Sequence, residues 1–446
     1  MFEKEHVIVE CQDFNHQGQG VCKLASFPLF VDFLLIGEKA EIEITKLTKN
    51  YGFGKIIKLL EKSEKREIPK CSAFGKCGGC EIMHMSYPAQ LAFKKQMSIN
   101  TLKKIGHLTN LPLSGIMGME NPYYYRNKVQ IPFQKKNNDV VCGFFQKNSH
   151  IIYPMKECFI QPTEATQIAL FICDFANKYH LSPYDEKTHT GILRHVLIRN
   201  NQQNEFIVVI VTNSVNFPNK VLFVSKITEQ FPQVRTIVQN INIERTNVVL
   251  GNKNIVWSGM GFLNENLLGL SFTISPHSFF HTNYEQTKRL YEQVLKYADP
   301  KPSDTIVDGY CGVGTIACFL AKSCKKVIGI EIVKEAIKDA KGNAVINSIE
   351  NVEFIVGKTE DEIKNFKSGD INIIVVDPPR KGCDRQLLEA IKLIKIPKVI
   401  YVSCDVATLA RDLECLVSDY EIKDMTFFDM FPQTCDVETC VLLALK

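Results

Sequence analysis

The sequence lacks any run of apolar residues long enough to span a bilayer, which excludes an α-helical membrane protein. Residues 1–6 are also too charged to begin a signal peptide, so we expect a cytoplasmic protein with no membrane partner. A strong charge of either sign is missing as well, since the formal net charge is only +4. This mild basicity permits a nucleic-acid partner but does not require one.

The 446 residues are 45% hydrophobic and 23% charged, as in an ordinary globular protein. A chain of this length is expected to form about three domains, at roughly 150 residues each. Sixteen cysteines are present. Because thiols stay reduced in the cytoplasm, we expect a few of them to bind metal or to react, and the others to pack.

The first two segments differ in their sequence pattern. Residues 1–60 have short hydrophobic runs punctuated by glycines, which predicts a small β-barrel. A charged linker follows, and residues 68–270 are expected to form a central domain with an amphipathic, Lys-rich helix near 87–105 and aromatic-rich strands. The lysines suit either RNA contact or a solvated helix face, and the aromatics suit either base stacking or a core.

The third segment, residues 271–446, alternates apolar runs with stretches of helical length after Pro300. The runs lie at 305–307, 327–330, 352–356, 371–376 and 399–402. This alternation predicts an α/β fold with a parallel, doubly wound sheet. Two final strands near 421–428 and 438–445 have no helix between them and are expected to close the sheet as a hairpin, an ending typical of a class I methyltransferase.

Three cysteines lie close together in the sequence. Cys71, Cys77 and Cys80 form a C-x5-C-x2-C pattern with two glycines in its tight loop. In a reducing compartment, three thiols at this spacing predict a metal site rather than packing. Zinc and an iron–sulfur cluster both accept four cysteine ligands, so both remain open at this point.

A fourth ligand is needed, and no nearby histidine or cysteine pair completes a zinc-finger pattern. We choose Cys158 over Cys142 and Cys173. The long stretch of sequence between Cys80 and a fourth ligand at Cys158 favours an iron–sulfur site over a compact zinc finger.

A glycine-rich loop, DGYCGVGT at residues 308–315, follows the first strand of the predicted sheet and opens its first helix. Its glycines, Gly312 among them, let a ligand approach the backbone. Glu331 ends the second strand, where an acid accepts hydrogen bonds from ribose hydroxyls. Because Asp308 and Tyr310 replace the first glycines of a dinucleotide fingerprint, the adenosine of S-adenosylmethionine fits better.

Three further groups are expected at the same edge of the sheet. Asp377, in the Asp-Pro-Pro-Arg turn after the fourth strand, can present its carboxylate to a planar base or to the cofactor. Cys404 follows the strand at 399–402 and precedes a helix, whose dipole would stabilise a thiolate. Glu438 begins the last strand, by topology near Cys404, and is a candidate general base.

Carbon methylation of a pyrimidine uses all these groups together. Uracil C5 is too weak a nucleophile to take a methyl group from a sulfonium, so a thiolate must first add at C6. At the ordinary pKa of cysteine only about 3% is thiolate at pH 7, so the helix end and neighbouring groups must help. A base then removes the C5 proton and the thiol is eliminated. The target base would have to be flipped out of its stack to reach Cys404.

In these motifs the chain resembles the RNA uracil-C5 methyltransferases along essentially its whole length, and the 23S ribosomal RNA branch in particular. The resemblance implies that residues 1–60 are a TRAM domain, an OB-like RNA-binding barrel, and that 271–446 are a Rossmann-like methyltransferase domain. It further implies a set of functional residues: nucleophile Cys404, base Glu438, cofactor contacts His281, Tyr310, Gly312, Glu331 and Asp377, and [4Fe-4S] ligands Cys71, Cys77, Cys80 and Cys158.

Three positions depart from the family pattern. His281 stands where relatives usually have Gln, so its contact with the cofactor is in question. Asp405 replaces Asn after the nucleophile, and we expect its carboxylate to raise the pKa of the thiol. Asp436 replaces the His that usually precedes the Val-Glu pair.

We therefore expect a monomer that uses S-adenosylmethionine to form 5-methyluridine in 23S rRNA. Methylation of a tRNA uridine is the nearest alternative. A catalytically weak RNA-binding or ribosome assembly factor is the alternative from another class.

Overall fold

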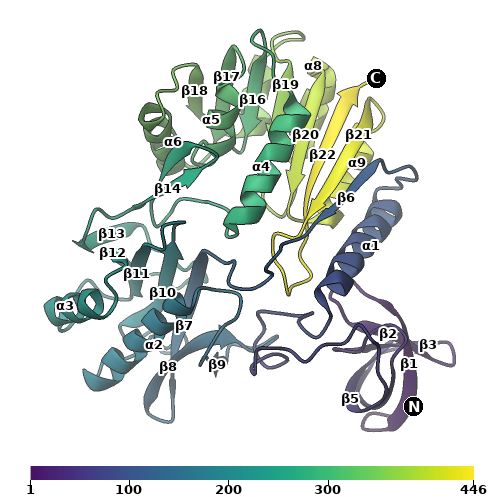
Figure 1. Ribbon diagram of the computed structural model, residues 1–446, viewed down its shortest axis with the longest axis vertical. Helices are drawn as coiled ribbons and strands as arrows, with labels where there is room; N and C mark the ends of the chain where they lie inside the picture. Colours follow the sequence, from purple (N-terminus) through teal and green to yellow (C-terminus); the bar gives the residue numbers. More distant parts are fainter. Residues whose placement is uncertain (1) are drawn as a thin grey trace.

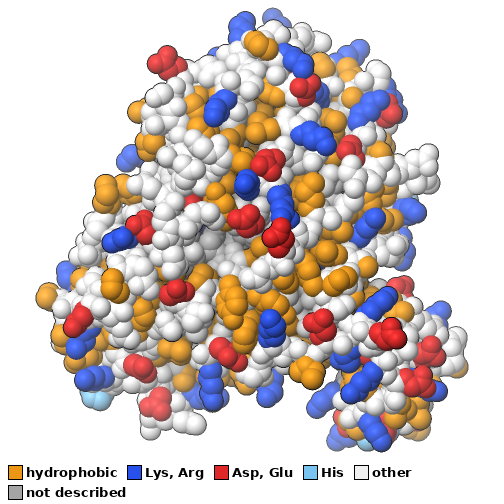
Figure 2. Space-filling view, viewed as in Figure 1, with side chains coloured by type: hydrophobic (Ala, Val, Ile, Leu, Met, Phe, Trp, Pro, Cys, Tyr) orange, Lys and Arg blue, Asp and Glu red, His pale blue; other side chains and the backbone are white. Residues whose placement is uncertain are grey.

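The computed structural model describes residues 2–446 and begins with a closed five-stranded barrel, ordered β1-β2-β3-β5-β4. Its strands are β1 (His6–Phe14), β2 (Gly20–Leu24), β3 (Phe27–Val31), β4 (Lys39–Leu47) and β5 (Gly52–Glu61). Alternate residues point inward, so that Leu29, Val31 and Ile42 are fully buried in the barrel core. Figure 1 shows this barrel in purple beside the rest of the chain, and Figure 2 shows it as a projecting lobe.

The segment after the barrel connects all parts of the molecule. Helix α1 (Tyr87–Ile105) packs along α9 (Val406–Leu416) of the carboxyl-terminal domain, and β6 (Leu113–Met117) then pairs in parallel with β21 (Tyr420–Phe428). These residues fall inside the predicted central domain, 68–270, yet they complete the carboxyl-terminal sheet. The sequence of β6 carries no signal of which sheet it joins, since parallel pairing depends on a partner some 300 residues away.

The central part is a seven-stranded sheet in the order β13-β12-β11-β10-β7-β8-β9, with helices against it. Its elements are β7 (Lys128–Lys136), β8 (Asp139–Phe145), β9 (Ile152–Pro154), α2 (Thr163–Lys178), β10 (Leu193–Asn200), β11 (Phe206–Thr212), α3 (Lys220–Gln230), β12 (Val234–Ile241) and β13 (Lys253–Ser258). β11 is buried at every residue, which identifies it as the centre of this core. A small hairpin, β14 (Leu263–Leu267) and β15 (Leu270–Ile274), leads onward.

The carboxyl-terminal sheet has eight strands in the order β18-β17-β16-β19-β20-β22-β21-β6, with helices on both faces (Figure 1). Its elements are α4 (Tyr284–Ala298), β16 (Thr305–Gly309), α5 (Thr315–Ala321), β17 (Lys326–Glu331), α6 (Lys334–Ile346), β18 (Val352–Val356), α7 (Thr359–Glu362), the 3-10 turn η1 (Ile363–Asn365), β19 (Ile373–Val376), α8 (Arg385–Ile394), β20 (Lys398–Ser403), α9, β21 and β22 (Glu438–Leu445). The predicted parallel strands are confirmed, and so is the closing hairpin of β21 and β22.

The order of this sheet determines where a ligand can bind. The chain crosses over between β16 and β19, which lie side by side although they are not consecutive. A crevice forms at such a switch point, outside the carboxyl ends of the parallel strands. Figure 1 shows that these ends face the central domain, and Figure 2 shows acidic and basic side chains interleaved across the middle of the molecule there. Within residues 2–446, no helix is both long and apolar enough to cross a membrane.

Candidate active site

Cys404 and Glu438 lie near each other at the carboxyl edge of the sheet. β20 and β22 are antiparallel neighbours whose last pair at this end is Ser403 and Thr439, so Cys404, just beyond β20, and Glu438, the first residue of β22, both adjoin that pair. Glu438 is 1% exposed, and its Oε1 atom has no hydrogen-bond partner. The sequence predicted from topology that Glu438 lies near Cys404, and in the structure the charge of Glu438 acts on this partly buried thiol.

The surroundings of Cys404 keep its thiol protonated in the resting protein. Burial raises the pKa of Cys404 to about 12, assisted by the charges of Glu438 and Asp377, while Arg380 lowers it. We expected the following helix to stabilise a thiolate, but this effect does not prevail, because Cys404 precedes the helix cap and is partly desolvated.

Asp405 is not among the main causes of this raised pKa. Its carboxylate caps α9 by accepting hydrogen bonds from the backbone N–H groups of Ala407 and Thr408, at 3.0 and 2.9 Å. The acid therefore meets the positive end of the helix. The carboxylates that act on the Cys404 thiol belong to Glu438 and Asp377.

Glu438 lies in a compact group of charged side chains. Burial raises its pKa to about 8; the charge of His281 opposes this rise, and that of Asp377 adds to it. His281 Nε2 lies 3.5 Å from Asp377 Oδ2, an ion-pair distance without a well-formed hydrogen bond. Burial lowers the pKa of His281, but Asp377 and Glu438 outweigh it and raise the pKa above its ordinary value. The two acidic side chains thus favour the protonated form of the imidazole.

The predicted nucleoside loop lies at the end of β16. Gly312 has a φ of +55°, and the space beside its Cα is open, so only hydrogen projects where a ligand would approach. Its N–H donates to Glu331 Oε2 at 3.2 Å, which joins the loop to the acid at the end of β17. Tyr310 also has a positive φ, +64°, a conformation that is costly for a residue with a side chain. The structure therefore brings these three predicted residues to one edge.

An ion pair between Arg380 and Asp436 was not predicted as a unit. Arg380 Nη2 lies 3.2 Å from Asp436 Oδ2, and both side chains are exposed. Arg380 comes from the turn after Asp377, and Asp436 lies just before Glu438. Asp436, which departs from the family pattern, is thus paired with Arg380 of the Asp-Pro-Pro-Arg turn. The two motifs, considered together, could have suggested this pairing.

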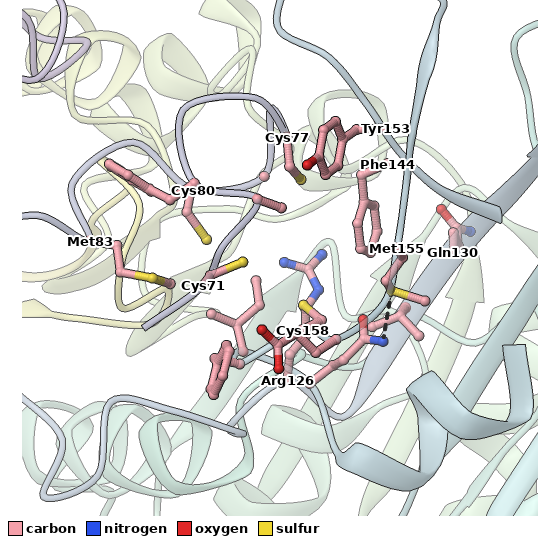
Figure 3. Close-up of a pocket in the computed structure, with 18 of the residues that line it drawn as sticks. Cys71, Cys77, Cys80, Met83, Arg126, Gln130, Phe144, Tyr153, Met155 and Cys158 are labelled. Carbon is pink, nitrogen blue, oxygen red and sulfur yellow. Dashed lines mark hydrogen bonds between the residues drawn. The ribbon is translucent and has the colours of Figure 1, made fainter. Parts of the chain in front are cut away.

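The four predicted cysteines line one cavity on the other side of the site. Cys71, Cys77, Cys80 and Cys158 all contribute to a cavity of about 390 Å³, and Figure 3 shows their side chains directed toward it. Arg126 lines the same cavity. The loop that carries Cys77 and Cys80 is held to the central sheet through the Gly78 N–H, which donates to the Phe145 carbonyl at 3.0 Å.

The rival candidates for the fourth position lie elsewhere. Cys142 and Cys173 are buried in the core of the central sheet, whereas Cys158 lines the cavity. In the part of the chain that the structure describes, no three His, Cys, Asp or Glu side chains converge closely enough to hold a metal ion. The four thiols are instead spread around a common space.

Sequence and structure comparisons define the class of this protein. Residues 261–446 match the family described as tRNA (Uracil-5-)-methyltransferase, and residues 2–57 match the TRAM domain. A solved structure of Pyrococcus abyssi tRNA (uracil-54, C5)-methyltransferase in complex with S-adenosyl-L-homocysteine is similar over 98% of this chain and 100% of its own, with a TM-score of 0.78 and 25% identity. The fold and the family match define an S-adenosylmethionine-dependent RNA methyltransferase.

Close relatives extend over the whole chain. An uncharacterized RNA methyltransferase of Oceanobacillus iheyensis is 46% identical over 98% of this chain and 95% of its own length. Another from Clostridium tetani is 42% identical over 96% of this chain and 94% of its own. The chain belongs to this family of uracil-5 RNA methyltransferases.

Proposed function

We propose that this protein methylates C5 of a uridine in 23S rRNA through a covalent bond between Cys404 and uracil C6. The observation that carries the proposal is the nearness of Cys404 and Glu438, which both adjoin the Ser403–Thr439 pair of β20 and β22, at the edge of the sheet that also carries the nucleoside loop. Nucleophile and base must reach neighbouring carbons, C6 and C5, of one small ring. Residues that adjoin the same pair of an antiparallel ladder are close enough for that task.

The chemical roles of the two residues follow from their positions. The Cys404 thiolate adds to C6, which makes C5 an enolate carbon that attacks the methyl group of S-adenosylmethionine. The carboxylate of Glu438 then takes the proton from C5, and expulsion of the Cys404 thiolate restores the C5–C6 double bond. A carboxylate with a raised pKa is a stronger base than an ordinary one, which suits removal of a carbon-bound proton.

The other predicted residues hold the methyl donor and the uracil. In this proposal Gly312, Tyr310 and Glu331 bind the adenosine part, with Glu331 accepting from ribose hydroxyls. Asp377 and His281 contact each other and act electrostatically on Glu438, and we assign them to orienting the donor and the base. When it is protonated, the imidazole offsets the repulsion between the Asp377 and Glu438 carboxylates, which an uncharged Gln at this position could not do.

The three segments share the work in this proposal. The barrel, residues 1–60, and the central domain, 68–270, hold the RNA, while residues 271–446 carry the chemistry, in a monomer. A tRNA uridine is the second candidate substrate, favoured by the printed name of the Pyrococcus abyssi enzyme that is similar along the full length. The two targets share the reaction and differ only in the RNA that is bound.

A pair of substitutions tests the mechanism. Glu438→Gln should leave C6 addition and methyl transfer intact but block loss of the C5 proton, so a denaturant-stable protein–RNA adduct should accumulate. Cys404→Ala should form no adduct and no 5-methyluridine. Both variants are incubated with S-adenosylmethionine and with 23S rRNA or tRNA, and the products are separated on denaturing gels. Absence of an adduct with either RNA would contradict the covalent mechanism and favour the assembly-factor alternative.

We also propose that Cys71, Cys77, Cys80 and Cys158 hold a [4Fe-4S] cluster. A single zinc ion draws its sulfurs to about 2.3 Å from one point, whereas a cluster of four irons spaces its thiolates widely around a volume. The observed spread around a 390 Å³ cavity suits the second arrangement. The cluster, if bound, would supply a rigid anionic body rather than electrons, because methyl transfer has no redox step.

Protein purified without oxygen tests this assignment. It should be brown, with about four irons per chain for one cluster. Cys77→Ser should lose the visible absorption, whereas Cys173→Ser, a matched change at a buried cysteine outside the cavity, should keep it. A colourless protein that carries zinc would refute the cluster.

A further inference from the structure

The loop that leads into Glu438 is held by parts of the chain far away in sequence. This base loop, residues 429–437, connects β21 to β22. Its two ends are adjacent, because Phe428 at the end of β21 lies opposite Glu438 at the start of β22. Asp429 directly follows Phe428, so a contact that fixes Asp429 also constrains the strand position that pairs with Glu438.

Asp429 is fixed by a buried ion pair with helix α1. Lys94 Nζ lies 2.5 Å from Asp429 Oδ1, and both side chains are 0% exposed. The same ammonium donates to the Phe431 carbonyl at 2.9 Å, and the Tyr87 hydroxyl donates to Asp429 Oδ2 at 2.7 Å. Helix α1 thus holds the start of the base loop through contacts to three atoms, the two carboxylate oxygens of Asp429 and the carbonyl oxygen of Phe431.

Gln433 forms a second anchor in the middle of the loop. It is fully buried, and its φ of +73° is a strained value for a residue other than glycine. Its side-chain Oε1 accepts from Gln90 Nε2 at 3.0 Å, and its N–H donates to Gln90 Oε1 at 3.1 Å. Its carbonyl accepts from the N–H groups of Glu81 and Ile82, both at 3.1 Å, just after the last cysteine of the cavity loop.

Stability alone does not account for the ion pair. Moving two charges from water into a protein core costs several kcal/mol each, and a well-packed apolar pair of equal volume is commonly as stable or more stable. What such a pair adds is geometry, since its hydrogen bonds are short and directional. A base that abstracts a proton from carbon needs such geometry, because a displacement of about 1 Å costs about a hundredfold in rate.

We propose that Lys94 and Asp429, braced by the Gln90–Gln433 amide pair, are positioning residues that place Glu438 for removal of the C5 proton. The inference rests on the proposed function, because it assumes that Glu438 is the base. It gives α1, a helix from the amino-terminal half of the chain, an indirect part in the last step of catalysis, through the position of Glu438.

The order of the chemical steps allows an effect on the position of Glu438 to be told apart from an effect on folding. Glu438 acts only after the C6–S bond and the C5–methyl bond have formed. When the base is displaced, the methylated adduct keeps its C5 proton, and the C6–S bond cannot break. A positioning defect therefore raises the amount of adduct, whereas a defect in folding or RNA binding lowers adduct and product together.

Two variants with a matched control test the proposal. Lys94→Met removes the ammonium but keeps the chain length; Gln433→Gly removes the amide but suits the positive φ. Lys95→Met makes the same change on the exposed face of α1. We expect both test variants to turn over at least tenfold more slowly, with little change in KM for RNA, and to accumulate adduct as Glu438→Gln does. Lys95→Met should resemble the unmodified protein.

Several results would overturn the inference. If Glu438→Gln accumulates adduct while folded Lys94→Met and Gln433→Gly do not, Lys94 and Gln433 are structural only. If Lys94→Met fails to fold, Tyr87→Phe, which removes one hydroxyl contact to Asp429, takes its place with the same readout. If Glu438→Gln itself forms no adduct, the proposed function fails first, which keeps the two failures distinct.

Discussion

At the scale of single residues, both groups proposed for catalysis rest in their protonated forms near neutral pH. Burial raises the pKa of Cys404 to about 12 and that of Glu438 to about 8. Each carboxylate at the site disfavours a negative charge on its neighbours, so proton release from one acidic group is opposed by the others. The sulfonium of the methyl donor would bring a positive charge to the same place and relieve that opposition.

The rate of methylation should consequently rise with pH. Cys404 attacks as thiolate and Glu438 accepts a proton as carboxylate, and each active form grows about tenfold per pH unit below its pKa. We expect kcat/KM for RNA to increase from pH 6.5 through 8, measured by release of tritium from C5-labelled uridine. A profile that is flat or falls over this range would contradict the protonation states described.

Asp405 and Asp377 should differ in their effect on the nucleophile. Asp405→Asn keeps a helix cap and should leave the rate of Cys404 alkylation at pH 8 nearly unchanged. Asp377→Asn removes a charge that raises the pKa of the thiol and should speed alkylation severalfold. Mass spectrometry of the Cys404 peptide after timed iodoacetamide treatment measures both. Faster alkylation in Asp405→Asn alone would restore the simpler, sequence-based expectation.

At the scale of elements, helix α1 depends on close contact with α9. A Cβ on Gly106, at the end of α1, would lie 2.7 Å from the Ala410 carbonyl oxygen of α9. Gly106→Ala should therefore lower the free energy of unfolding by about 1–3 kcal/mol through overpacking. The control is Gly342→Ala in α6, where a Cβ meets nothing within 4 Å and the change should stabilise by about 0.5–1 kcal/mol. Urea unfolding measures both, and equal effects would contradict the docking described.

Most elements could be predicted because their signals are local. The apolar runs at 305–307 and 399–402 become β16 and β20, and the acid at 331 ends β17 as its position indicated. The place of β6 was not predictable, since its five residues satisfy either sheet equally well. Its pairing is decided by the open edge of β21 and by α1, which brings the chain there.

At the scale of the whole molecule, the site is assembled from distant parts of one chain. Cys404 and Glu438 could be predicted because strand order brings them together and each follows a recognisable motif. The pairing of Lys94 with Asp429 could not, because 335 residues separate them and neither lies in a metal or nucleotide pattern. From the sequence alone, a lysine on a helix is interpreted as a solvated charge, because nothing indicates a partner in the core.

The division of labour in space explains this difference. The chemistry lies at the carboxyl edge of one sheet, which topology predicts. The loop that leads into Glu438 is held in place by the amino-terminal part of the chain, next to the barrel and the cysteine loop. One such contact is the hydrogen bond from the Glu81 N–H to the Gln433 carbonyl. Such contacts depend on how the parts pack, which no local pattern in the chain encodes.

The central claim is methyl transfer to C5 of a uridine in RNA, and nucleoside mass spectrometry tests it most directly. Purified protein is incubated with methyl-labelled S-adenosylmethionine and with unmodified 23S rRNA or tRNA, beside a Cys404→Ala control. The account predicts labelled 5-methyluridine in 23S rRNA and none with Cys404→Ala; label in tRNA alone would move the substrate but keep the chemistry. A methyl group on another atom or another base, or 5-methyluridine formed equally by Cys404→Ala, would contradict the account.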